Sequence, residues 1–174
     1  MDLEATCDDR GAVPKQEMEI IEIGAVLVEP REFAVLSEYQ SFVRPQRHPR
    51  LTVFCRGLTT ISQAEVDAAP LFPQVIAAFK TWMYEHGATV FCSWGEYDRK
   101  QMELDCALYG VPYPMPGRHL NVKALFSETR GMKKRLGMAE ALQHAGLELT
   151  GTHHRGIDDA RNIARLLPLA VGRR

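Results

Sequence analysis

The chain has almost no net charge, few cysteines and no long apolar run, and each absence narrows the classes of protein to which it can belong. Its 174 residues carry 21 Lys and Arg against 22 Asp and Glu, a formal net charge of −1. A domain that binds nucleic acid through a basic face spread over its whole surface has a strong positive excess. Any site for a polyanion must therefore be local and short.

The four cysteines lie far apart and form no close pair: Cys7, Cys55, Cys92 and Cys106. That spacing argues against a zinc site and is typical of reduced thiols that pack in or near a core. No apolar segment approaches the roughly 20 residues of a membrane span, and the acidic N-terminus lacks the basic and apolar regions of a signal peptide. We therefore expect one compact domain over residues 1–174, cytoplasmic and without contact to a membrane.

Strand patterns come first along the chain, and helical patterns follow. Residues 19–28 are rich in β-branched side chains and residues 35–43 alternate loosely, so the two predict a hairpin that turns at 29–31. A short buried strand is expected at 88–93. Helices are expected at 62–69, from about 73 to Gly87, at 98–109, at 138–144 and from about 156 to 167. Strands that alternate with helices after an opening hairpin indicate a mixed α/β sheet.

Several acidic residues occupy positions that a mixed α/β sheet brings close together. Residues two apart in a strand point to the same face, so Asp2 and Glu4 can share one cluster while Leu3 turns to the core. Asp98 follows the buried strand and starts a helix, which places it at the carboxyl edge of the sheet, where ligand sites of α/β proteins collect. The alternatives are a solvated strand face for Asp2 and Glu4, and an ordinary first-turn acidic residue for Asp98.

Two neighbouring aspartates in the C-terminal helix differ in their angle from its apolar stripe. At about 100° per residue, Asp159 lies about 100° from the middle of the stripe and Asp158 about 156° away. Asp159 therefore borders the core and is the better metal ligand, whereas Asp158 faces water and suits the positive end of the helix dipole. His154, just before the helix, can lean over the same edge as a general base. A surface histidine is the alternative, and it is the preferred interpretation of His153.

These residues form three ordered motifs that resemble those of a known family. Asp2-Leu3-Glu4-Ala5-Thr6, Asp98, and His154 with Asp159 are similar to the motifs of the DEDDh, DnaQ-like 3′–5′ exonuclease superfamily. Further matches resemble the branch of exoribonucleases that trims small interfering RNA and histone messenger RNA ends, which has short bacterial relatives. These matches are Leu51–Ile61, Gln63, Val66-Asp67-Ala68 and Phe72-Pro73. The resemblance covers nearly the whole chain and implies an α/β, RNase H-like fold with a mixed central sheet flanked by helices.

The resemblance implies a hydrolase that releases nucleoside 5′-monophosphates from the 3′ end of single-stranded nucleic acid, RNA more than DNA. Its cofactors would be two divalent ions, Mg²⁺ or Mn²⁺, held by Asp2, Glu4, Asp98 and Asp159. His154 would accept the proton of the attacking water. A DNA-directed exonuclease and an inactive nucleic-acid- or protein-binding relative are the alternatives, and the catalytic residues do not separate RNA from DNA.

The same resemblance assigns residues to the substrate. Leu3, Ala5 and Thr6 would line the pocket for the terminal nucleotide. Phe54 and Trp94 would stack on bases, since every base offers a π-face. Either aromatic residue could equally belong to the core, so these two assignments stay open.

Two features depart from the family's pattern. The family has several apolar residues ahead of the Asp-Leu-Glu segment, forming a central strand, whereas here only Met1 precedes it. A shortened middle strand would leave neighbouring backbone groups unpaired, so we expect the functional protein to start upstream of Met1. Thr60 stands where the branch often has glycine, and a positive φ at this position would strain the loop.

Overall fold

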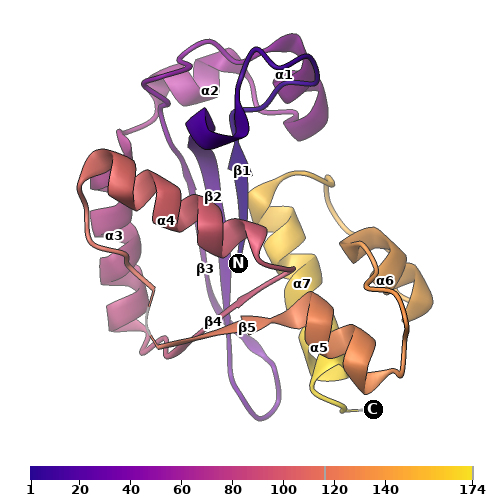
Figure 1. Cartoon of the computed structure of the whole chain (residues 1–174). Coiled ribbons are helices and arrows are strands. Elements are labelled where there is room, and N and C mark those ends of the chain that lie inside the picture. The colour runs from indigo at the N-terminus through magenta and orange to yellow at the C-terminus, as the bar shows by residue number, and fades with distance from the viewer. Residues whose placement is uncertain (116, 174) are drawn as a thin grey trace.

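The computed structural model describes residues 1–115 and 117–173, and its strands form two small sheets (Figure 1). β1 (Asp2–Ala5), β2 (Ile20–Val28) and β3 (Val35–Phe42) are antiparallel neighbours in that order. β4 (Val90–Ser93) and β5 (Arg118–Asn121) form a parallel pair. The hairpin of β2 and β3 and the mixed α/β architecture agree with the sequence patterns.

Helices cover both faces of the three-stranded sheet. Among the described residues they are α1 (Val53–Thr59), α2 (Gln63–Ala68), α3 (Phe72–Glu85), α4 (Tyr97–Tyr109), α5 (Val122–Thr129), α6 (Met138–His144) and α7 (Gly156–Ala170), with a 3₁₀ turn at Lys15–Glu17. α3 and α4 pack on the face that bears Leu3 and Ile23, whereas α7 lies along the opposite face against β2 (Figure 1). None of the described helices is both long enough and apolar enough to cross a bilayer.

Side-chain caps set the ends of several helices. The Ser62 hydroxyl accepts from the Glu65 N–H at 3.2 Å, and the Glu65 carboxylate accepts from the Ser62 N–H at 2.7 Å, so α2 begins with a capping box. The Asn121 amide oxygen likewise accepts from the Ala124 N–H at 3.0 Å and begins α5. Gly110 ends α4 with a φ of 63°, a conformation that glycine adopts without steric cost.

The sequence patterns do not predict α1, β5 or α5, and they end α7 three residues early. α1 is short, contains Gly57 and starts with a β-branched residue, so its periodicity is weak. Asn121 is both the last residue of β5 and the N-cap of α5. No turn residues therefore separate this strand from the helix that follows, which removes the usual sign of a boundary.

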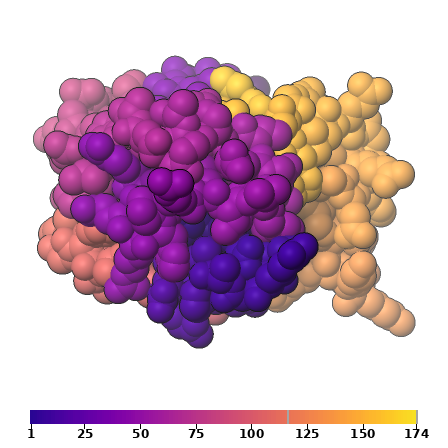
Figure 2. All heavy atoms as spheres, turned by 90° about the horizontal axis from the view of Figure 1, so that it is seen from above, coloured from indigo at the N-terminus to yellow at the C-terminus, as the bar shows by residue number. Residues whose placement is uncertain are grey.

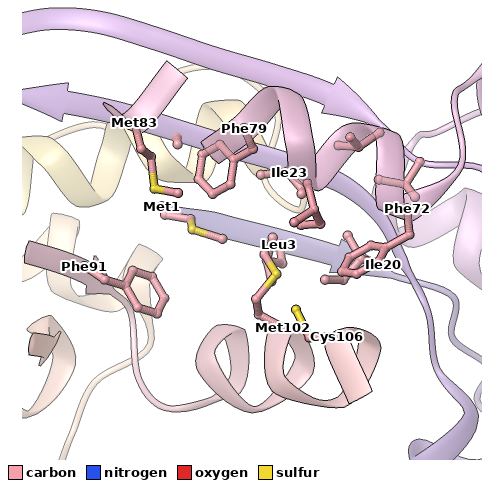
Figure 3. Close-up of a cluster of buried hydrophobic side chains, with 14 residues drawn as sticks. Met1, Leu3, Ile20, Ile23, Phe72, Phe79, Met83, Phe91, Met102 and Cys106 are labelled. Atoms are coloured by element: carbon pink, nitrogen blue, oxygen red, sulfur yellow. The ribbon is translucent and has the colours of Figure 1, made fainter. Parts of the chain in front are cut away.

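The apolar core falls into two main clusters. One joins β1 and β2 to α3 and α4, and Figure 3 shows Leu3 and Ile23 between Phe79 of α3 and Met102 of α4. The other lies among α5, α6 and α7. The cysteines behave as expected, because all four are free thiols, two of them buried and two half-buried.

Thr60 follows α1 with a φ of 60° and a ψ of 6°, so the positive φ considered for this position is confirmed. A β-branched residue is strained in the left-handed region. We expect Thr60→Gly to raise the free energy of unfolding by about 1 kcal/mol, because relief of this strain exceeds the entropy that glycine loses on folding. Urea denaturation measures the change. Thr60→Ala keeps the Cβ atom, so it should raise the free energy of unfolding by less. A Gly variant that is no more stable than the Ala variant would contradict the interpretation.

Candidate active site

Four carboxylates from three distant parts of the chain meet beside β1. Asp2 and Glu4 come from β1, Asp98 from the first turn of α4 and Asp159 from the first turn of α7. One ligand oxygen each from Asp2, Glu4 and Asp159 lie within 4.8 Å of one another. Asp98 joins them through Leu3, whose backbone N–H donates to its Oδ1 at 3.0 Å. The structure thus brings together the four predicted metal ligands.

Two glycines allow α7 to reach β1. A Cβ atom on Gly24 of β2 would lie 2.0 Å from the carbonyl carbon of Gly156, and one on Gly156 would lie 3.2 Å from the carbonyl oxygen of Asp2. The first turn of α7 therefore rests directly on the backbone of β1 and β2. Because Asp159 is in that turn, this contact sets its distance from Asp2.

A buried glutamate fixes the start of α7. Glu22 of β2 has an exposed fraction of 0%, and its Oε2 accepts from the Gly156 N–H at 2.9 Å and from Arg155 Nε at 3.2 Å. Gln40 donates to its Oε1 at 2.7 Å. A carboxylate at a helix N-terminus satisfies free N–H groups and interacts well with the helix dipole.

Sequence reasoning does not identify Glu22, Gly24 or Arg155 as parts of the site. A usable signal exists, since Glu22 is the one charged residue within the apolar strand Ile20–Val28. A charge at such a position is buried, and a buried charge requires a partner. The sequence alone does not say that the partner is Arg155, 133 positions away.

Burial and mutual repulsion make the carboxylates hard to ionise without a cation. Burial raises the pKa of Glu4 to about 8, and the nearby Asp159 carboxylate adds to the shift. Burial also raises the pKa of Asp159 to about 6 and that of Asp2 well above its usual range. Removing like charges from water favours their neutral forms, and a bound cation reverses that preference.

The donor set fits a hard divalent cation. Every donor in the cluster is a carboxylate oxygen, which is the ligand that Mg²⁺ and Mn²⁺ prefer. Asp159 Oδ1 is buried and has no hydrogen-bond partner among the described residues, so it is available to a ligand. The residues present therefore fit a divalent metal centre.

His154 lies next to this cluster in a strained conformation. Its φ is 63°, and its backbone N–H donates to Asp159 Oδ2 at 3.0 Å. Burial and the neighbouring His153 both lower the pKa of His154, so its imidazole is held in the neutral form that can accept a proton. A non-glycine residue persists at positive φ only where the surrounding structure compensates.

His153 is exposed, as expected, but it is not remote from the site. Its ring stacks on that of His154 with centroids 4.0 Å apart, and its Nε2 lies 3.8 Å from Asp159 Oδ2. The burial predicted for Asp159 is confirmed at 5% exposure. Asp158 is only partly buried and holds the preceding loop, because it accepts from the Thr152 N–H at 2.9 Å.

The three residues assigned to the nucleotide pocket are buried. The Leu3 side chain packs in the core, and its N–H already donates to Asp98. The Ala5 carbonyl accepts from Cys55 Sγ at 3.7 Å. The Thr6 hydroxyl accepts from the Glu19 N–H at 3.0 Å. A nucleotide role for these residues stays a prediction, and Leu3 has no free N–H to offer it.

The two aromatic residues fall in different environments. Phe54 projects from α1 with 39% of its surface exposed, as stacking on a base requires. Trp94 belongs to the cluster of α5, α6 and α7: its ring centroid lies 5.9 Å from that of Phe126, and its Nε1 donates to the Leu136 carbonyl at 3.2 Å. These contacts favour the core alternative for Trp94, which is partly buried, and its stacking on a base stays a prediction.

An antiparallel and a parallel sheet flanked by helices, with carboxylates from two of those helices converging on the first strand, define a nuclease of the RNase H-like class. The family model named Exonuclease (RNase T) matches residues 1–167, and the chain belongs to this family. The nuclease domain of 3′hExo, a DEDDh family member solved with bound rAMP, superposes with a TM-score of 0.88 at 30% identity, over 95% of this chain and 86% of that one. The expected fold and family are confirmed.

Curated relatives carry exonuclease names. The chain is 33% identical over 175 residues to ERI1 exoribonuclease 3 of Bos taurus, covering 96% of this chain and 51% of that protein. It is 29% identical over 170 residues to the probable 3′–5′ exonuclease KapD of Bacillus subtilis strain 168. This match covers 97% of this chain and 82% of that protein. The chain thus spans about half the length of the ERI1 relative.

We expect Gly24→Ala to separate α7 from β2. Its Cβ atom would meet backbone atoms of Gly156 and Ile157, which cannot rotate away. The free energy of unfolding should fall by about 1–3 kcal/mol, measured by urea denaturation. Gly57→Ala is the matched control, because a Cβ there meets nothing within 4 Å. Equal effects of the two substitutions would show that the contact is not tight.

We expect the metal-free protein to lose stability as the pH rises from 4.5 to about 8, the ordinary and the folded pKa of Glu4. In that range the folded state keeps a proton that the unfolded state releases, so a rising pH favours unfolding. Urea denaturation in EDTA at about pH 5 and about pH 8 measures this loss. The loss should be smaller in Glu4→Gln but unchanged in Glu128→Gln, a control that makes the same change at an exposed position, and equal slopes in all three proteins would refute the burial argument.

Proposed function

We propose that this protein is a metal-dependent 3′–5′ exonuclease that hydrolyses phosphodiester bonds at the 3′ end of single-stranded RNA and releases nucleoside 5′-monophosphates. The observation that carries the proposal is the buried cluster of Asp2, Glu4 and Asp159, with ligand oxygens within 4.8 Å and one Asp159 oxygen without a partner. Such a cluster costs stability unless it binds cations. The exoribonuclease name of the ERI1 relative supports RNA as the substrate.

The cofactors would be two divalent ions, Mg²⁺ or Mn²⁺, with Asp2, Glu4, Asp98 and Asp159 as ligands. When bound, such ions stabilise the charge that develops on the scissile phosphate and favour ionisation of the attacking water. The carboxylates of this chain bind and orient them. Asp98 can accept from Leu3 with Oδ1 and still offer Oδ2.

His154 accepts the proton of the attacking water. The lowered pKa keeps its imidazole unprotonated near neutral pH. The hydrogen bond from its backbone N–H to Asp159 holds the residue beside the carboxylates at a fixed distance. A general base can act only if it lies within reach of the proton that it accepts, whatever its pKa. The bond to Asp159 places His154 beside the carboxylates.

The surface around α1 suits the rest of a polyanion. Phe54, Val53 and Leu58 are exposed on this helix, and Arg50 and Arg56 are exposed beside them. α1 lies against the end of β1, since Cys55 donates to Ala5 and Thr52 donates to the Cys7 carbonyl at 2.7 Å. Figure 2 views this side of the molecule, with the purple α1 region next to the indigo N-terminal segment. A local surface with aromatic and basic side chains is the kind of nucleic-acid site that a nearly neutral chain can offer.

The test uses a 5′-labelled single-stranded RNA and its DNA counterpart, incubated with Mg²⁺, Mn²⁺ or EDTA and resolved by length. Metal-dependent shortening from the 3′ end, faster on RNA, is the expected result. His154→Ala should slow it by about 10²–10⁴-fold, the usual contribution of a general base. Asp159→Asn should abolish most of it by removing one ligand charge.

Asp158→Asn is the matched control for Asp159→Asn, because it makes the same change one residue away and outside the cluster. It should keep near-normal turnover. Faster shortening of DNA would assign the activity to a DNA-directed enzyme. No shortening by the unmodified protein, or full turnover by Asp159→Asn, would overturn the proposal.

A further inference from the structure

Two histidine rings and one carboxylate meet at the start of α7. His153 and His154 form the turn before this helix, and Asp159 lies in its first turn. One ligand atom from each of the three residues lies within 4.8 Å of the other two. His153 Nε2 is 3.8 Å from Asp159 Oδ2. This group shares Asp159 with the carboxylate cluster, but it adds two imidazole nitrogens, which the cluster lacks.

The backbone of the turn brings the two rings together. Neighbouring side chains of an extended chain point to opposite sides. The φ of 63° at His154 breaks that alternation, and the two rings stack with centroids 4.0 Å apart and an angle of 28° between their planes. The left-handed conformation costs a non-glycine residue free energy. The turn thus presents both imidazoles on one side, beside Asp159.

The two rings differ from other histidine rings of the chain in having no hydrogen bond. Three other rings each take part in a hydrogen bond of 2.8–3.1 Å, those of His48, His86 and His119. Within the part of the chain that the structure describes, the rings of His153 and His154 form no such bond, and only the backbone N–H of His154 bonds to Asp159. Both imidazoles therefore have a nitrogen available to a ligand.

Asp159 is prepared in the same way. Its side chain is almost fully buried, at 5% exposure, and its Oδ1 has no partner among the described residues. Its Oδ2 accepts from the His154 backbone N–H at 3.0 Å, which fixes the orientation of the carboxylate. Carboxylates that bind metals are commonly oriented by such a hydrogen bond.

Nitrogen donors decide which ions this group suits. Mg²⁺ prefers oxygen ligands, whereas Zn²⁺ and its neighbours in the transition series bind imidazole well. With bonds of about 2.0–2.1 Å, two ligand atoms on one tetrahedral Zn²⁺ lie roughly 3.3–3.5 Å apart. The 3.8 Å between His153 and Asp159 is slightly longer, and a small rotation of the exposed His153 side chain removes the difference.

We propose that His153, His154 and Asp159 form a second metal site, which binds a borderline transition-metal ion such as Zn²⁺. Three protein ligands leave the fourth tetrahedral position to water. The side chain of His153 is 40% exposed, so the ion can enter and leave from solvent. The site uses no thiolate, in agreement with the wide spacing of the four cysteines.

An ion at this site inhibits the proposed hydrolysis, and this consequence alone rests on the proposed function. A neutral imidazole has one lone pair, so His154 cannot bind Zn²⁺ through it and also accept a proton there. Asp159 is shared as well, since it also belongs to the group of Asp2 and Glu4. Zn²⁺ would therefore act as a reversible inhibitor, whereas the binding site itself does not depend on the activity of the protein.

The test follows the visible absorption of Co²⁺, a spectroscopic substitute for Zn²⁺, added to the metal-free protein without RNA. Tetrahedral Co²⁺ with nitrogen ligands absorbs far more strongly than octahedral Co²⁺ among oxygen ligands. The unmodified protein should develop the strong absorption, and Zn²⁺ should remove it. His153→Gln should raise the Kd for this Co²⁺ at least about tenfold, because it removes one ligand. His144→Gln is the matched control, since it makes the same change at an exposed histidine of α6.

Glu4→Gln separates the two sites, because it changes the carboxylate cluster and leaves all three ligands of the second site in place. The strong absorption should persist in this variant. Absorption that survives His153→Gln unchanged, or that Glu4→Gln abolishes, would assign the ion to the carboxylates and overturn the proposal. So would the lack of strong absorption in the unmodified protein. An equal Tm of His153→Gln and the unmodified protein, both without metal, shows that the variant is folded.

Inhibition is measured separately, as the fraction of RNA-shortening activity that each protein keeps when Zn²⁺ is added to Mg²⁺. His153→Gln should keep a larger fraction of its own activity than the unmodified protein keeps, and equal fractions would refute the inhibitory role. An unmodified protein that binds Co²⁺ as expected but never shortens RNA would overturn the proposed function and support the metal site.

Discussion

The contact between Gly24 of β2 and Gly156 of α7 is the constraint on which the rest of the site depends. No side chain fits between these two backbones, so the helix lies as near to the sheet as a helix can. Glu22, two positions along the same strand, then reaches the Gly156 N–H and holds the helix in register. Since Asp159 lies three residues after Gly156 in the same turn, its approach to Asp2 and Glu4 follows from this contact. Active-site geometry is here a consequence of backbone packing, and the carboxylates themselves oppose it through their repulsion.

That repulsion indicates what the cluster is for. A protein selected only for stability would not bury Glu4 and Asp159 so close together, because each carboxylate loses hydration and the Asp159 carboxylate further raises the pKa of Glu4. Glu22 shows the contrast, since it is more deeply buried and yet has Arg155 and a helix N-terminus as partners. The unpartnered Oδ1 of Asp159 has no such compensation. Strain of this kind persists at functional sites, where binding of a ligand removes it.

The sequence predicts those features that depend on local periodicity and misses those that depend on contacts. The burial of Asp159 follows from its angle on α7, and Ser62 begins α2 because its capping box is local. β5 and α5 are not predicted, because no turn residues separate the end of the strand from the start of the helix. The core environment of Trp94 depends on Phe126 and Leu136, which are distant in sequence and cannot be inferred from the residues around Trp94. Glu22 was recognisable as unusual, but its role depends on a helix more than a hundred residues later.

β1 carries two of the carboxylates, so the position of the cluster depends on how this strand is held. It has four residues and, in the part of the chain that the structure describes, a continuous hydrogen-bonded ladder only with β2. On its other side it is held by two single bonds, from Met1 to Cys92 and from Leu3 to Asp98. Asp98 therefore supports with one oxygen the strand that presents Asp2 and Glu4, and it can bind a cation with the other. Metal ligands must be held within about 0.5 Å of their working positions. A strand paired along only one edge gains support from the carboxylate of Asp98, so a cation bound at this cluster would stabilise the sheet as well.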